Sequence, residues 1–506
     1  MSTGGVFQLI TNTGLQDRLI MATDKLIENM NKIAKNNLEK QRKLNPNIPD
    51  KVLLTKEESW IPIVQDIEKT HLLFVNASFK PFVAMAHEYS KTPTRQGKAS
   101  LGNSFSFTLP VIGDFVNDAV VYIKLTGLAA VSALDKVRYV EFLGHRLMKR
   151  VRFKVQNQIF DEYTSDTQNA YFQYKVPSHK EVGYLRNIGQ EVPRLGYLTA
   201  DPTTDEVREY RYFGDGAQTF KRTQSDVEMW IPILFWFKDI QNSLPNFLLP
   251  LNQTDIEIEL EAESNLISFG DYGGGGSYTV PSVSECYLYL NHIFIQPEVA
   301  KVFMTRFGFQ LIRVHRTHTE QLTRHSDRIL LHQIKWPVEC LYVCFRPRVN
   351  LTNSQRWHRG TNITEVDVHS AVITGVSTVA VNDATYLNEQ PVISNMSLSA
   401  NDITLFPEMK PEFYNNYIPI QYGATIKTPY NIGWMMVPFA SKPGEYQPSG
   451  HLNVSRSREL YLSYVSNIVS NSYVIRPDNP TDLLVIAECI NFILYKSGNA
   501  CLKFST

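Results

Sequence analysis

The sequence predicts an all-β fold of two sandwich-like bodies in tandem, preceded by an N-terminal arm that contains an amphipathic helix. Aromatic residues make up 11% of the 506 residues, with 25 Tyr and 27 Phe, and such side chains pack well on pleated sheets. Short runs of alternating apolar and polar residues recur after residue 70, bounded by Pro, Gly, Asn and Asp. A large β-domain takes roughly 200–250 residues, so the length fits two of them.

The N-terminal arm, residues 1–70, has a different texture from the rest. Apolar residues recur there at three- and four-residue spacing, which predicts one apolar stripe on a helix over roughly 15–40: Leu15, Leu19, Ala22, Leu26, Met30 and Ile33. Pro46 and Pro49 end that pattern. Two interpretations stay open, a helix that packs on its own body and a helix that docks on a partner or a membrane surface.

The first β-body is predicted over 71–296, from strands with a period of two. These are Ser104–Leu109, Ala119–Leu125, Val151–Val155 and Ile256–Leu260, and the apolar run Trp230–Phe237 also has strand length. No apolar run reaches the roughly 18 residues of a membrane helix.

A short linker helix is predicted over 297–305. It follows the strand pattern Cys286–Ile295, and Pro297 and Glu298 are both favourable in a first helical turn. A new strand-like run begins at Phe307, so the second β-body is placed at 306–506. Three polar segments, 196–227, 268–284 and 351–390, are predicted to be surface loops.

The reactive side chains form no convincing catalytic or metal site, and we expect neither an enzyme nor a bound cofactor. Four histidines fall within 18 positions, but four arginines lie among them and like charge opposes a bound cation: His315, His318, His325 and His332, with Arg313, Arg316, Arg324 and Arg328. Cys340 and Cys344 would lie about 13 Å apart on one strand face, too far for a disulfide or one zinc ion, and are expected to be core residues. The glycine run 273–276 lacks the residues of a phosphate loop.

The charge balance argues against a protein that coats nucleic acid. Lys+Arg and Asp+Glu are both 50, so the net charge is zero, whereas neutralising phosphates needs clustered excess cation. The five cysteines are few and odd in number, which favours folding in a reducing compartment. The N-terminal residues do not have the pattern of a secretory signal.

Several segments resemble the major capsid proteins of nucleocytoplasmic large DNA viruses. Glu445–Arg456 is similar to the Gln-Pro-Ser-Gly-x-x-Asn-x-Ser-Arg signature of that family, Ile490–Ser505 to its last strands, and Trp230–Lys238 with Leu244-Pro245 to a strand and turn of its first domain. Within the family the likeness is closest to African swine fever virus and related amoebal viruses. It rests on Met1–Phe7, Asn76–Phe82, Val151–Phe153 with Asp161–Asp166, and Phe309–Arg316.

This resemblance implies a double jelly roll, two eight-stranded sandwiches in tandem. It further implies a homotrimeric, pseudo-hexagonal capsomer that tiles the icosahedral shell of a large DNA virus and is assembled in the host cytoplasm. The implied partners are neighbouring capsomers, minor capsid and penton proteins and a virus-coded chaperone, with no direct nucleic-acid contact. The arm 1–70 would lie on the inner side of the shell, against minor capsid proteins or an internal membrane.

The expected function is therefore assembly, and the residues singled out are those of the signature: Gln447, Pro448, Ser449, Gly450, Asn453, Ser455 and Arg456. Pro and Gly would set a tight turn, and Arg456 would pair or donate to carbonyls at a packed joint. The alternatives are a double-jelly-roll scaffold of immature virions, a bicupin metalloenzyme and a carbohydrate-binding sandwich. The bicupin needs a His-x-His pair, whereas this chain has His315-x-x-His318.

Overall fold

The computed structural model describes residues 84–504 except 193, 200–206, 213–216, 271–275, 307, 375–376, 402, 424, 457–458 and 497. The predicted arm helix at 15–40 and Gly273–Gly275 lie outside the described residues. The chain divides into two compact units. One comprises Met1–Glu88 with Ile293–Arg306 and carries helix α8 (Pro297–Arg306). The other comprises Tyr89–His292 with Phe307–Thr506.

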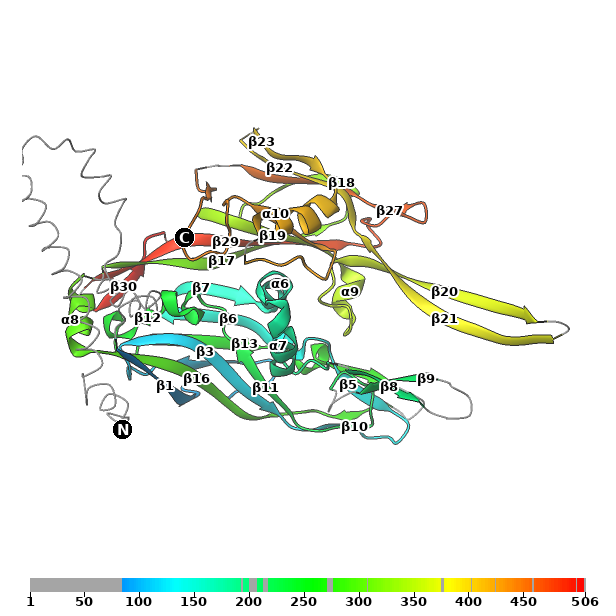
Figure 1. Ribbon diagram of the computed structural model, residues 1–506, viewed down its shortest axis with the longest axis horizontal. Coiled ribbons are helices and arrows are strands. Elements are labelled where there is room, and N and C mark those ends of the chain that lie inside the picture. The colour runs from blue at the N-terminus through cyan, green and yellow to red at the C-terminus, as the bar shows by residue number, and fades with distance from the viewer. Residues whose placement is uncertain are drawn as a thin grey trace, which may run out of the picture. The chain divides into compact units, whose positions relative to one another are not determined.

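The first sandwich has two four-stranded paths (Figure 1), with a short strand, β12 (Leu244–Pro245), paired beside β3. One sheet has the order β1 (Met85–Pro93), β16 (Val283–Ile295), β3 (Phe115–Leu125), β11 (Val227–Pro232). The other has the order β2 (Ser104–Thr108), β13 (Thr254–Leu260), β6 (Met148–Val155), β7 (Gln158–Thr164).

The second sandwich repeats this arrangement. Its first sheet has the order β17 (Phe309–Leu322), β29 (Thr481–Lys496), β19 (Pro337–Pro347), β24 (Trp434–Pro438). Its second sheet has the order β18 (Ser326–Leu330), β26 (Leu460–Ser466), β22 (Ile393–Ala400), β23 (Ile403–Met409). Numbered along the chain within each sandwich, both have sheets of order 1-8-3-6 and 2-7-4-5. The predicted double jelly roll is confirmed.

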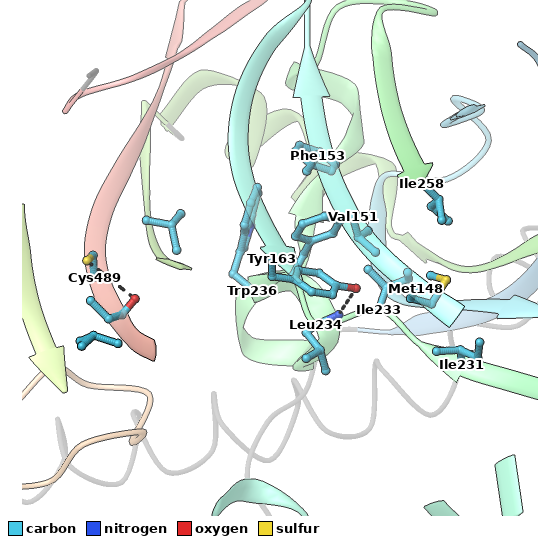
Figure 2. Close-up of a cluster of buried hydrophobic side chains, with 14 of the residues drawn as sticks. Met148, Val151, Phe153, Tyr163, Ile231, Ile233, Leu234, Trp236, Ile258 and Cys489 are labelled. Carbon is cyan, nitrogen blue, oxygen red and sulfur yellow. Dashed lines mark hydrogen bonds between the residues drawn. The ribbon is translucent and has the colours of Figure 1, made fainter. Parts of the chain in front are cut away.

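Alternating burial builds the core between the sheets. Strand β13 alternates buried and half-buried residues along its whole length, because successive side chains of a strand point to opposite faces. Figure 2 shows the first core, where Phe153 lies among aromatic rings and the Tyr163 hydroxyl accepts a hydrogen bond from the Leu234 N–H at 3.2 Å. Tyr163 thereby stays fully buried with its polar atom satisfied.

The apolar run Trp230–Phe237 is only partly a strand. Strand β11 ends at Pro232, and a 3-10 helix, η2 (Trp236–Lys238), follows. Pro232 has no N–H to continue the ladder, while Phe235, Trp236 and Phe237 turn into the core. Core filling therefore accounts for the second half of this run.

The prediction of loops is wrong for much of the polar segments. Residues 351–390 contain α9 (Arg348–Thr352) at one end and then a long hairpin of β20 (Thr361–Thr374) and β21 (Ser377–Pro391), drawn as a ribbon in Figure 1. A second hairpin pairs β8 (Arg194–Thr199) with β9 (Val207–Tyr212). Polar composition does not prevent pairing, because the ladder bonds join backbone groups.

Short strands and helices fill the remaining connections. The strands are β4 (Leu128–Ala130), β5 (Lys136–Tyr139), β10 (Thr223–Gln224), β14 (Ile267–Gly270), β15 (Tyr278–Thr279), β25 (Leu452–Asn453), β27 (Ile468–Val469), β28 (Ser472–Tyr473) and β30 (Asn499–Leu502). The helices are α5 (Leu143–Leu147), α6 (Ser165–Lys175), α7 (Glu181–Asn187) and α10 (Ile418–Tyr422), with the π-helical turn η6 (Phe413–Tyr417). Among the described helices, none is long and apolar enough to cross a membrane.

Candidate functional site

The contact between the two sandwiches is the candidate functional site, and helix α6 is its main element. At the start of the helix the Thr164 N–H donates a hydrogen bond to Thr167 Oγ1 at 3.5 Å, and Asp166 lies in the first turn, where a negative charge is favourable. The sequence pattern did not predict this helix, because its first half is polar. Thr167, Gln168 and Asn169 are nevertheless buried, and Asn169 donates a hydrogen bond to the His358 carbonyl oxygen of the second sandwich at 2.9 Å.

Helix α6 covers the outer face of the sheet that contains β19. The ring of Tyr174 lies 4.9 Å from that of Tyr342 in β19, and Ala170 belongs to the same apolar cluster. The cluster also contains Cys340, Cys344, Ile418, Ile426, Trp434, Met436, Leu484 and Ile486. Leu341 and Val343 face the other way, into the sandwich core. All eleven residues of β19 are therefore buried, and both cysteines are core residues as predicted.

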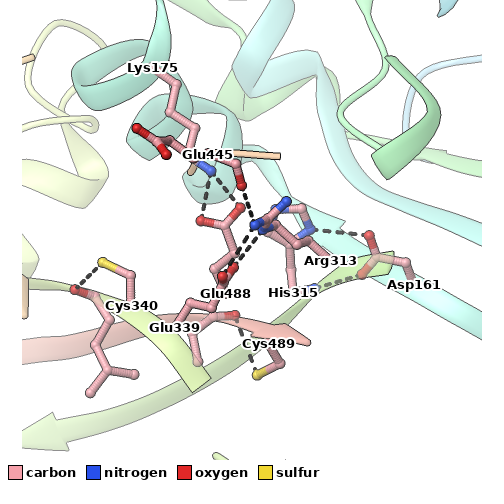
Figure 3. A network of polar contacts seen from close by, with 11 residues as sticks. Asp161, Lys175, Arg313, His315, Glu339, Cys340, Glu445, Glu488 and Cys489 are labelled. Carbon is pink, nitrogen blue, oxygen red and sulfur yellow. Dashed lines mark hydrogen bonds and ion pairs between the residues drawn. The ribbon is translucent and has the colours of Figure 1, made fainter. Parts of the chain in front are cut away.

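A buried polar network borders this apolar cluster (Figure 3). The Lys175 ammonium at the end of α6 donates to both carboxylate oxygens of Glu488, at 2.5 and 2.7 Å. Arg313 donates to both carboxylate oxygens of Glu339, at 2.5 and 3.2 Å, and to the Glu445 carbonyl oxygen. The two cations and two carboxylates balance in charge, as buried ionic groups must.

The pKa values reflect the competition between burial and pairing. Burial opposes ionisation of Glu488, but Lys175 and Arg313 outweigh it and lower the Glu488 pKa to about 2. Burial raises the pKa of Glu339, and its bond to Arg313 offsets only part of that effect. The charge of Glu488 therefore depends on Lys175, which the first sandwich supplies.

Hydrogen bonds of two aspartates also join the sandwiches. Asp161 of β7 is 1% exposed; its Oδ1 accepts the His315 backbone N–H at 2.8 Å and its Oδ2 lies 3.1 Å from His315 Nδ1. Asp166 of α6 accepts a hydrogen bond from Arg346 of β19 at 2.5 Å. Both pairs connect residues more than 150 positions apart.

The segment 354–358 reaches from the second sandwich onto the first. The Trp357 indole N–H donates to the Glu141 carbonyl at 2.7 Å, and the Glu141 N–H donates to the Ser354 carbonyl at 3.2 Å. The His358 ring lies 4.6 Å from that of Phe142. Trp357 is 1% exposed, so its side chain anchors this segment and is buried as deeply as the side chains of the hydrophobic core.

The signature residues form a loop within the second sandwich, between β24 and β26. Ser449 Oγ accepts the Lys442 N–H at 2.7 Å, and Ser455 Oγ accepts the Trp336 N–H at 2.8 Å. Gly450 has φ of 149°, and a Cβ there would lie 3.2 Å from the Phe439 carbonyl oxygen.

The other signature residues differ in exposure. Asn453 lies in β25, opposite Pro337 of β19. Gln447 and Arg456 are exposed, and Pro448 is half-buried.

The four histidines of the predicted polar region do not converge. His318 and His332 lie edge to face at 5.0 Å, His325 stacks on Tyr473 at 4.5 Å, and His315 faces Asp161. In the described part of the chain, no three His, Cys, Asp or Glu side chains are placed to hold one metal ion.

Sequence reasoning missed the buried charges Glu339 and Glu488. Each lies in an apolar stretch, Val338-Glu339-Cys340 and Ala487-Glu488-Cys489. A carboxylate inside a strand that is apolar on both faces was the available signal, since such a group needs a buried partner.

Two family models match this chain. One, described as large eukaryotic DNA virus major capsid protein, matches residues 301–505, and the other, described as major capsid protein N-terminus, matches residues 76–296. The hexon protein p72 of African swine fever virus is 27% identical over the full length of both chains. The major capsid protein of Rana tigrina ranavirus is 22% identical over 74% of this chain and 79% of its own.

Solved structures show the same fold. The Faustovirus major capsid protein superposes with a TM-score of 0.74 at 27% identity, covering 96% of this chain and all of its own. PBCV-1 Vp54 superposes with a TM-score of 0.60 at 18% identity, covering 85% of this chain and 98% of its own. The second likeness concerns the fold alone.

Proposed function

Since this chain belongs to the family of large eukaryotic DNA virus major capsid proteins, we propose that it builds the virion capsid as a homotrimeric, pseudo-hexagonal capsomer. One observation supports the proposed trimer. Each chain holds two sandwiches with the same strand order, so three chains around one axis present six similar bodies. A capsomer of six similar bodies can tile a facet of the shell. Because the ring of three chains is closed, every chain uses both of its surfaces for contact with a neighbouring chain.

The contact between the sandwiches supports this role. The buried network of Lys175, Glu488, Arg313 and Glu339, together with the apolar cluster around Tyr174 and Tyr342, fixes one sandwich against the other. A capsomer of six bodies needs that fixed angle within each chain. The signature residues Gln447 to Arg456 would serve the same end by holding the loop that supplies the Glu445 carbonyl to Arg313.

The same proposal names the binding partners of the capsomer. Neighbouring capsomers, minor capsid and penton proteins would contact the trimer. The arm 1–70 would face the inner side of the shell, where minor capsid proteins or an internal membrane would meet it. Assembly in the host cytoplasm and a virus-coded chaperone belong to this proposal, as do the domain limits 71–296 and 306–506 with the linker 297–305.

Light scattering coupled to size exclusion tests the trimer. A stable species of three times 57.9 kDa, about 174 kDa, is expected, with a pseudo-hexagonal outline in electron micrographs. A well-folded protein that stays monomeric at tens of micromolar and in purified virions would contradict the proposal.

A further inference from the structure

The outer face of the sheet β1-β16-β3-β11 carries a set of neighbouring aromatic rings. Trp230 of β11 lies opposite Tyr122 of β3 with ring centres 4.8 Å apart, and 5.0 Å from Tyr289 of β16. Tyr287 stacks 6.5 Å from Tyr122, with the Lys91 ammonium 3.5 Å above its ring. Trp230 is 40% exposed and the three tyrosines are half-buried. A large aromatic surface thus remains open to water in the single chain.

The corresponding face of the second sandwich is closed. Strand β19 occupies the place of β3, and β24 that of β11, in the shared strand order. Trp434 of β24 is 1% exposed, against 40% for Trp230 of β11. Tyr342 of β19 lies under Tyr174 of helix α6, which the first sandwich supplies. Two faces in equivalent positions therefore differ in the presence of a covering helix.

The covering helix has a counterpart that presents apolar side chains outward. Helix α6 lies in the connection between the fifth and sixth strands of the first sandwich, β7 and β11. The same connection in the second sandwich, between β23 and β24, holds η6 and α10. Ile418 of α10 packs inward in the cluster with Trp434, whereas Tyr417 is 53% and Ile420 75% exposed.

We propose that a second copy of this chain occupies the aromatic face, with Tyr417 at the end of its η6 and Ile420 of its α10 packed on Tyr122, Trp230 and Tyr289. This inference rests on the proposed trimer and names its contact. The contact within the chain is the template: the helix between strands five and six of one sandwich covers the outer sheet face of the next. Each chain then offers one open helix and one open face, so copies join head to tail and three close a ring.

The chemistry of the two surfaces matches. An aromatic centre surrounded by charged side chains, here Lys91, Lys124 and Glu228, is the pattern of a protein interface whose middle is desolvated and whose rim stays wet. Tyr417 and Ile420 supply one aromatic and one aliphatic side chain for that centre. Trp and Tyr are also the residues that most often dominate binding free energy.

Two separate variants test the proposal, Trp230→Glu on the face and Ile420→Glu on the helix. Each places a carboxylate in every contact of the ring and should weaken that contact by roughly 30-fold or more, so both variants should be monomeric under conditions where the wild type is trimeric. Leu251→Glu is the matched control, because Leu251 is 70% exposed outside both surfaces, and it should remain trimeric. Circular dichroism should be unchanged in all three variants. The melting temperature should stay at the wild-type value for Leu251→Glu and fall for the two monomeric variants, because assembly no longer stabilises their folded state.

Mixing the two monomeric variants gives the sharper result. Trp230→Glu keeps an intact helix and Ile420→Glu an intact face, so the mixture should form a heterodimer of twice 57.9 kDa, about 116 kDa, and no larger ring. Monomers that fail to pair on mixing would overturn the assigned contact. Trimers that persist in both variants would also overturn the assigned contact, while leaving the proposed trimer itself intact, and would assign the aromatic face to another occupant such as the arm 1–70. If the wild-type protein itself is monomeric, the result contradicts the proposed function instead.

Discussion

Replacing Lys175 by Met should destabilise the fold by about 2 to 3 kcal/mol at pH 7. Lys175 lowers the Glu488 pKa, from 4.5 to about 2 when Arg313 acts with it, and about 2.5 pKa units correspond to about 3 kcal/mol. Loss of one partner of a buried pair costs a similar amount, roughly 3 to 5 kcal/mol. Screening is small because the Lys175 side chain is 19% and that of Glu488 6% exposed. Arg313 remains in the variant, so the lower part of the range is expected.

Thermal unfolding at fixed protein concentration measures this change. The compact unit that holds both sandwiches has roughly 400 residues, and an unfolding entropy of about 2.1 cal/mol/K per residue then gives a shift of about 3 °C. The matched control is Lys149→Met, which removes an ion pair to Glu259 of similar length, 2.8 Å, whose lysine is 46% exposed. That variant should stay within about 0.5 kcal/mol of the wild type.

The pH dependence identifies Glu488 as the cause. Its folded pKa lies below its unfolded value, so its stabilisation is present above about pH 4.5 and is lost as the pH falls toward 2. The difference between wild type and Lys175→Met should therefore be constant from pH 6 to 8 and shrink below about pH 4.5. Glu339, whose pKa is raised, acts in the opposite direction but is present in both proteins. A Lys175→Met variant as stable as Lys149→Met would refute the reasoning. So would a stability difference between wild type and Lys175→Met that did not change below pH 4.5.

Three further changes probe other parts of the fold. Gly450→Ala should cost about 1 to 3 kcal/mol in a denaturant titration, because φ of 149° strains an L residue and Cβ would meet the Phe439 carbonyl. Gly183→Ala in helix α7, with open space around it, should be neutral or slightly stabilising in the same titration. Trp357→Ala should cost about 3 to 5 kcal/mol by the same method, since it empties a buried site and removes the hydrogen bond to Glu141; a loss below 1 kcal/mol would show that the segment is not packed as described. Burial lowers the pKa of His358 to about 3, and the nearby Arg359 adds to this effect, while the Glu141 carboxylate lies 3.8 Å from its ring. Because the folded pKa lies below the unfolded value, stability is lost as the pH falls below about 6.5. The loss should be about 2 kcal/mol at pH 5. His145 and His292, whose pKa values burial lowers to about 3 and about 4, contribute in the same direction, so His358→Gln should reduce the loss of stability between pH 7 and 5 by about 2 kcal/mol without abolishing it. An unchanged pH dependence would exclude His358 as a cause.

Local sequence pattern predicted the strands well where one face is buried and the other is wet. Ile256–Leu260 alternates strictly in sequence and alternates in burial as part of β13. The pattern failed where contacts between residues distant in sequence determine burial or strand pairing. Helix α6 has no apolar stripe in its first half, yet Asn169 is buried there and donates a hydrogen bond to the His358 carbonyl oxygen of the second sandwich at 2.9 Å. The polar run 361–391 pairs with itself, Val366 opposite Tyr386, although its composition suggested a loop.

The candidate site was less accessible to sequence reasoning than the fold. Asp161 meets His315 across 154 positions, and Lys175 meets Glu488 across 313. Neither member of these pairs carries a local signal for its partner. The signature segment was found by resemblance, yet the resemblance did not reveal that Ser449 and Ser455 hold backbone N–H groups within the second sandwich.

The two sandwiches share a strand order but differ in the chemistry of their outer sheet faces, and that difference has a physical reason. The face that α6 covers is closed within the chain, so it can carry Cys340, Tyr342 and Met436 with little contact to water at any stage after folding. A face that meets its partner only on assembly must first be soluble. Tyrosine rings with polar tips and flanking charges such as Lys124 and Glu228 satisfy both states. The mixed character of the face around Trp230 is therefore what a contact formed after folding requires, whereas a surface destined to stay in water would have no need of four adjacent aromatic rings.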